Sequence, residues 1–155
     1  MKLLRRSGKV AVIELDAGEH FVVAELFKRY PVLPPSHFEL SRCGEFEGME
    51  EDEAFLQETM SDEQMANVKE LKELLTTEKY IKQVGDAYQI FLERPQIEWL
   101  LQVVNDIRVG SWAMLGSPEE VSDVEDFETD PSKRSYYFAM ELSTMVQSVL
   151  LMSLR

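Results

Sequence analysis

One segment limits the folds open to this chain more than any other. On a helical wheel at about 100° per residue, residues 96–115 show one wide arc that is almost wholly apolar. Its members are Trp99, Leu100, Val103, Val104, Ile107, Met114 and Leu115. Pro95 suits the first turn of such a helix, and residues 116–118, Gly-Ser-Pro, would stop it. We therefore predict a helix from about 95 to 115, and a helix apolar over so much of its circumference belongs at the centre of the fold.

A single arginine, Arg108, lies within this apolar arc. Its guanidinium must snorkel, stack or pair, and Trp112 lies one helical turn further on. Two interpretations stay open: a packing arginine in an internal ion pair, or an anchor for an anionic ligand or a partner carboxylate. Asp106 lies roughly 160° away on the wheel, so it cannot pair with Arg108 within the helix. The candidate binding residues are Trp99, Asn105, Asp106, Arg108 and Trp112.

Two stretches indicate β-structure. Residues 10–15 form a β-branched, apolar run of strand length. Residues 80–84 and 87–92 favour a hairpin with Gly85 and Asp86 in its turn, although a helix broken at Gly85 is the alternative. Together these runs predict a small antiparallel sheet.

The remaining helices follow from caps and periodicity. Asp16, three residues before Glu19, is typical of a capping box and predicts a helix over 17–30. We expect its apolar face to hold Phe21, Val22, Leu26 and Phe27. Three prolines, Pro31, Pro34 and Pro35, end it, and residues 36–48 read as loop.

Two further helices are predicted in the middle of the chain and one at its end. Acidic residues open one at 50–60, and a second cap at Ser61 starts another that reaches Leu75. Its apolar face would hold Met65, Val68, Leu71, Leu74 and Leu75. Residues 119–130 form an acidic linker, after which Asp130 or Ser132 caps a helix over 135–154. The apolar stripe of this last helix would be Phe138, Leu142, Met145, Val149 and Met152.

The composition of the chain limits the kinds of partner that it can bind. Among 155 residues, 29 acidic and 16 basic side chains give a net charge of −13. Such a surface repels nucleic-acid phosphates and anionic membranes and would attract basic or peptide-like protein partners. The alternative is that the acidity serves solubility alone. Residues 136–154 are apolar but carry too many polar side chains for a membrane span. One cysteine, Cys43, and no signal-peptide pattern indicate a cytoplasmic protein.

Catalytic signatures are weak. His20, His37 and Cys43 show no spacing typical of a zinc site or of a nucleophile and its base. The seven glycines are scattered and form no phosphate-binding loop. We therefore assign no catalytic residue, metal or cofactor, and lean against an enzyme.

The segment Tyr88 to Gly116, with Trp99, Asn105, Asp106 and Arg108, resembles a family of uncharacterised, mainly actinobacterial proteins. In that family a strand leads into a helix reading roughly W-L-x-x-L-N-D-x-R-L, and the terminal helix of this chain is similar to its closing segment. Trp112 departs from the pattern, since glycine is expected there. The resemblance implies no established activity, and at most a loose link to proteolysis or regulation.

These observations predict a single domain over residues 1–155, of α+β class and mainly α: a helical bundle around the central helix, with a small antiparallel sheet. The first hypothesis for function is a non-catalytic interaction or regulatory module. The alternatives are a small-molecule enzyme or sensor with a pocket near Arg108, and a homo-oligomer that uses the terminal helix as its interface.

Overall fold

The computed structural model describes the whole chain except residues 8, 39–49 and 119–129. Its strands are β1 (Lys2–Ser7), β2 (Val10–Asp16), β3 (Ile81–Val84) and β4 (Ala87–Glu93). Its helices are α1 (Ala17–Phe27), α2 (Glu50–Thr76), α3 (Arg94–Met114) and α5 (Pro131–Leu154), with one 3-10 turn, η1 (Pro35–Phe38). The predicted class, α+β and mainly α, is confirmed.

The four strands form one antiparallel sheet in the order β1-β2-β4-β3. The predicted hairpin is confirmed, and Gly85 supplies the positive φ of 62° that its turn needs. Side chains of β2 alternate between the two faces of the sheet, and those on the face toward the helices join the core: Ala11, Ile13 and Leu15. Strand β1 was not predicted, because its first residues lack the β-branched signature that marks β2.

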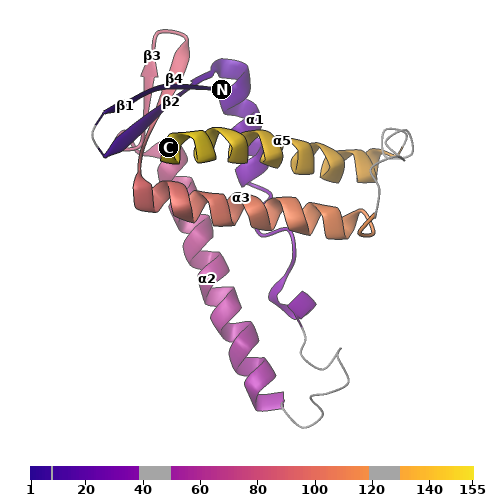
Figure 1. Ribbon diagram of the computed structural model, residues 1–155. Helices are drawn as coiled ribbons and strands as arrows, with labels where there is room; N and C mark the ends of the chain where they lie inside the picture. The colour runs from indigo at the N-terminus through magenta and orange to yellow at the C-terminus, as the bar shows by residue number, and fades with distance from the viewer. Residues whose placement is uncertain (8, 39–49, 119–129) are drawn as a thin grey trace.

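Helix α3 lies at the centre of the core, as its wheel predicts. Val103, Val104 and Ile107 are at most 1% exposed. Figure 1 shows α3 and α5 running side by side beneath the sheet. Of the predicted arc, Met114 in the last turn is exposed, whereas Leu115 at its end is buried; Trp112, outside the arc, is exposed as well.

The residues that α3 and α5 bury include several small ones as well as large aliphatic side chains. Ser111 on α3, and Ala139, Ser143 and Ser153 on α5, are small and buried. The predicted apolar stripe of the terminal helix is therefore largely wrong: Val149 is buried, but Phe138, Met145 and Met152 face outward. The reason is that small side chains permit a closer helix approach than the bulky ones, so the bulky ones turn away from α3.

Helix α1 begins with the predicted capping box. The Glu19 amide donates to Asp16 Oδ1 at 2.8 Å, and the Asp16 amide donates to Glu19 Oε2 at 3.0 Å. The predicted apolar face is partly wrong, because Val23 is buried with Leu26 and Phe27 whereas Phe21 and Val22 are exposed. The helix ends at Phe27 rather than Tyr30.

Helix α2 is one continuous helix, so the predicted break at Ser61 is wrong. A cap-like sequence does not end a helix by itself, and no glycine or proline lies within Glu50–Thr76. Its C-terminal part joins the core through Leu71 and Leu74, while Met65 and Val68 are exposed. Its N-terminal part projects away from the sheet and the other helices (Figure 1).

Three boundary predictions need correction or lie outside the described residues. Residues 36–38 belong to the 3-10 turn rather than to a loop. Asp130, not Ser132, caps α5, which starts at Pro131 instead of Ser135; the Ser132 amide donates to Asp130 Oδ1 at 2.9 Å. The predicted loop over 39–48 and the acidic linker over 119–129 lie outside the described part of the chain.

Candidate functional site

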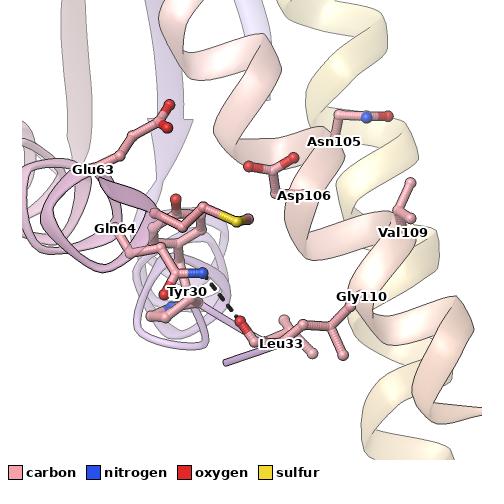
Figure 2. A pocket seen from close by; sticks show the side chains of 11 residues that line it. Tyr30, Leu33, Glu63, Gln64, Asn105, Asp106, Val109 and Gly110 are labelled. Atoms are coloured by element: carbon pink, nitrogen blue, oxygen red, sulfur yellow. Dashed lines mark hydrogen bonds between the residues drawn. The ribbon is translucent and has the colours of Figure 1, made fainter. Parts of the chain in front are cut away.

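A pocket of about 290 Å³ lies between α2, α3 and the segment that follows α1. Figure 2 shows its side chains. It is lined by Tyr30, Pro31, Val32, Leu33, Met60, Glu63, Gln64, Asn105, Asp106, Val109 and Gly110. We call it the α2–α3 pocket.

Two carboxylates dominate its chemistry. Glu63 comes from α2 and Asp106 from α3, and Figure 2 places them on opposite sides of the pocket. No lysine, arginine or histidine is among the described residues that line it. The pocket therefore presents negative charge from two elements without a cation in its own wall.

The surroundings of Asp106 disfavour its charged form. The residue keeps an exposed surface, yet desolvation by the atoms packed around the carboxyl group raises its pKa, and the charge of Glu63 raises it further. Burial likewise raises the pKa of Tyr30; the hydrogen bond from Asn67 opposes that rise, and Asp106 and Glu63 add to it. A cation placed in the pocket would counter the electrostatic part of these effects.

A chain of hydrogen bonds holds the base of the pocket. The Trp99 indole donates to Asn67 Oδ1 at 2.8 Å, and Asn67 Nδ2 donates to the Tyr30 hydroxyl at 2.9 Å. These bonds join α3, α2 and the end of the α1 segment. They fix the distance between the two helices that carry Glu63 and Asp106.

The third wall is the extended segment after α1, and two contacts hold it. The Gln64 side chain donates to the Leu33 carbonyl at 3.1 Å, as Figure 2 shows. Gly110 allows the segment to approach α3, since a Cβ built there would lie 2.8 Å from Val32 Cβ. Together with Met60 of α2 and Val109 of α3, Val32 and Leu33 of this segment give the pocket its apolar lining.

The five residues predicted as a site do not converge. Asn105 and Asp106 line the α2–α3 pocket, and Trp99 supports its base. Arg108 and Trp112 line a separate hollow of about 250 Å³ with Val109 and Met140. Asp106 and Arg108 thus make different contacts, as the wheel predicts.

Arg108 is half-buried, and its guanidinium pairs with an amide rather than a carboxylate. Its Nη2 donates to Asn105 Oδ1 at 3.1 Å, and Gln147 Nε2 donates to the same oxygen at 3.4 Å. Within the described residues, Arg108 Nε is buried without a partner. Trp112 donates to the Pro118 carbonyl at 3.2 Å.

Sequence reasoning missed Tyr30, Glu63 and Gln64. Glu63 closely follows Ser61, and the cap-like pattern at Ser61 predicted that a new helix begins there. Only the continuous course of α2 past α3 brings it opposite Asp106. No local signal could have found this pairing.

Two further features of the described residues bear on function. Among the described residues, no group of three or more histidine, cysteine, aspartate or glutamate side chains could hold a metal ion. One described helix, α5, is long and apolar enough to cross a membrane by length and composition alone, and 39% of that window is buried inside the fold. A core helix of a soluble protein passes the same test, so this is weak support for a span.

Comparison with known proteins adds no relative. No family model, no curated protein and no solved structure matches the chain. The resemblance to the actinobacterial family stays a prediction, and the α2–α3 pocket has to be interpreted from its own chemistry.

Proposed function

We propose that this chain is a non-catalytic interaction module of the cytoplasm, which binds a basic segment of a protein partner at the α2–α3 pocket. The observation that carries the proposal is the pair of carboxylates, Glu63 and Asp106, on opposite sides of a pocket without a cation among its described lining residues. The raised pKa of Asp106 supports it, because a lysine or arginine side chain would stabilise the charged form.

The shape of the pocket supports a single side chain as its occupant. Lysine and arginine combine a charged head with an aliphatic stem. The head would lie between Glu63 and Asp106, and the stem would pack on Val32, Met60 and Val109. A volume of about 290 Å³ is at the lower limit of ordinary small-molecule pockets, which begin at about 300 Å³.

The charge of the whole chain supports the same class of partner. A net charge of −13 attracts a basic segment over long range and raises its association rate at low salt. The resemblance to the actinobacterial family suggests regulation linked to proteolysis as the process that such a partner serves.

A small-molecule enzyme or sensor site at Arg108 is the alternative. Its support is the buried Arg108 Nε, which lacks a partner among the described residues. Among the described residues, the hollow there is lined by Arg108, Val109, Trp112 and Met140. Because Arg108 already hydrogen-bonds Asn105, we favour the α2–α3 pocket.

The test is an amide NMR titration of the full chain with a short peptide that carries one lysine between leucines. We expect shifts at Glu63, Gln64, Asp106 and Gly110, and weaker binding as salt rises. In the variant Glu63→Gln/Asp106→Asn, the affinity should fall by about tenfold or more.

The matched control removes the same charge elsewhere. Glu58 and Glu70 are exposed on α2 and lie outside the pocket, so Glu58→Gln/Glu70→Gln should change affinity by less than about threefold. A peptide with glutamate in place of lysine should not bind. Equal losses in both double variants would reduce the interaction to general charge attraction and overturn the pocket as its site.

A further inference from the structure

A second pocket, of about 530 Å³, lies between α1 and α2. Its size is within the range of ordinary small-molecule sites, which is about 300–1,000 Å³. Ala24 lies one helical turn after His20 and one turn before Lys28, and all three line the pocket. The alanine side chain is short, so this stretch of α1 leaves room in front of α2. We call this cavity the α1–α2 pocket.

The floor of the α1–α2 pocket is apolar. Phe27 of α1 and Leu71 of α2 line it and are only 4% and 3% exposed. Leu75 lies one turn after Leu71 and is partly buried against the core. An aliphatic group placed on these three side chains would be removed from water, which stabilises the bound state.

The mouth of the α1–α2 pocket carries positive charge. Lys28 and Lys72 line it, and both are exposed. No aspartate or glutamate is among the described residues of its lining, although the chain has 29 acidic side chains and 16 basic ones. The charge of this pocket is therefore opposite to that of the α2–α3 pocket, and it complements an anion.

Lys72 has its charge free for such an anion. Within the described part of the chain, its ammonium group makes no ion pair. No carboxylate lies one helical turn from it in either direction, where α2 carries Val68, Lys69, Leu75 and Thr76. Lys28 does pair with Glu25 at 2.5 Å, but an exposed pair of this kind contributes little and leaves the ammonium group accessible.

His20 offers one further polar atom at the pocket. Its ring stacks on Tyr88, with the ring centres 4.0 Å apart and the planes 12° from parallel. Its Nε2 is buried and has no hydrogen-bond partner among the described residues. Buried polar atoms in proteins are normally paired, so His20 has a hydrogen-bonding atom to offer a bound ligand.

We propose that the α1–α2 pocket binds a small carboxylate with an aliphatic tail, of the medium-chain fatty-acid class. The tail lies on Phe27, Leu71 and Leu75, and the carboxylate lies beside Lys28 and Lys72. A ligand with only polar groups would leave the buried floor unused, and a neutral apolar one would leave the two lysines unused. An acidic protein segment fits less well, because the rest of its chain would meet a surface of net charge −13.

This site is separate from the α2–α3 pocket. Tyr30 is the one described residue that lines both. The variants below change no residue of the α2–α3 pocket, so the two binding properties can fail independently.

The test is an amide NMR titration of the full chain with octanoate. We expect shifts grouped at Ala24, Leu71, Lys72 and Leu75, with a dissociation constant of about 1 mM or lower. Octanol has the same tail without the charge, and it should bind at the same residues at least about threefold more weakly. Added salt should weaken the binding of octanoate more than that of octanol.

A pair of double variants tests the charges. Lys28→Gln/Lys72→Gln should weaken octanoate binding by about fivefold and change octanol binding by less than about twofold, because only octanoate is charged. Damage to the fold would affect both ligands alike. The matched control, Lys9→Gln/Lys69→Gln, removes two exposed lysines outside the pocket and should change octanoate binding by less than about twofold.

A second pair of variants tests the cavity itself. Ala24→Leu fills the space in front of α1 and should abolish binding of both octanoate and octanol. Ala66→Leu makes the same change at an exposed position of α2 outside the pocket and should leave both affinities in place. Cooperative unfolding in urea shows that each variant is folded.

Four outcomes overturn the proposal. They are the absence of octanoate shifts in the pocket, equal losses of octanoate and octanol in Lys28→Gln/Lys72→Gln, and unchanged binding in Ala24→Leu. The fourth is a glutamate-rich peptide that binds the same residues more tightly than octanoate, which makes the pocket a protein-docking site. Loss of octanoate binding alone in the lysine variant, and of both ligands in Ala24→Leu, supports the proposal.

Discussion

Trp99 on α3 donates its indole N–H to the side-chain oxygen of Asn67 on α2, over 2.8 Å, and this bond is the first link of the chain that reaches Tyr30. Helix α2 is also held by the Gln64 hydrogen bond to the Leu33 carbonyl and by Leu71 and Leu74 in the core, while its N-terminal part projects from the body (Figure 1). The Asn67 amide is therefore one of the contacts that set the geometry of the α2–α3 pocket.

The first prediction concerns that amide. Asn67→Ala leaves the Trp99 indole and the Tyr30 hydroxyl without their partner, and each lost bond costs about 1 kcal/mol, or more where the group left behind is buried. We expect the free energy of unfolding in urea to fall by about 2 kcal/mol. The exposed Gln102→Ala is the control and should change it by less than about 0.5 kcal/mol.

The second prediction concerns the approach of the Val32 segment to α3. Gly110→Ala improves helix propensity by about 1 kcal/mol, yet its new Cβ would lie 2.8 Å from Val32 Cβ. We expect a net loss of about 1–3 kcal/mol in the free energy of unfolding, because overpacking outweighs propensity. The loss should shrink in a Val32→Gly background, and an equal loss in both backgrounds would argue against the contact.

The third prediction separates two buried serines of the α3–α5 seam. Among the described residues, Ser111 Oγ has no hydrogen-bond partner, whereas Ser143 Oγ donates to the Ala139 carbonyl at 2.6 Å. Ser111→Ala should raise the free energy of unfolding by about 1 kcal/mol, since it removes an unsatisfied group. Ser143→Ala should lower it by up to about 1 kcal/mol, and the same sign for both variants would contradict the assignment.

The fourth prediction is a pH dependence. The pKa of Asp106 is raised in the folded chain above its ordinary value of 3.8, so the folded state holds this proton more tightly than the unfolded state. The contribution of Asp106 to stability therefore falls as pH rises from 3.8 through the folded pKa, and the full penalty is present above the folded pKa.

Asp106→Asn removes this penalty. The variant should be more stable than the parent at neutral pH, and the difference should vanish below pH 3.8, where both states of the parent are protonated. Urea unfolding across this range measures it. Glu63→Gln should lower the pKa of Asp106, seen by carboxyl-carbon NMR, and Glu58→Gln should leave it in place. A difference that stays constant with pH would rule out the titration of Asp106 as its cause.

Much of the fold could be predicted because its signals are local. The Asp16–Glu19 capping box, the Gly85 turn and the apolar arc of α3 each depend on residues within a few positions of one another. The candidate site was only half predicted. Asn105 and Asp106 were named on α3, but Glu63 lies in α2, far from them along the chain.

The sequence by itself determined which face of α3 is buried, since only one of its faces is apolar. On α1 and α5 apolar residues occur around most of the circumference, so more than one stripe could turn inward. Tertiary structure decided between them: the close approach of α3 selected Ala139 and Ser143 for the seam and left Phe138 and Met145 outside. The physical reason is that burial depends on how well two surfaces interlock. The sequence of one segment alone does not specify the surface against which it will pack.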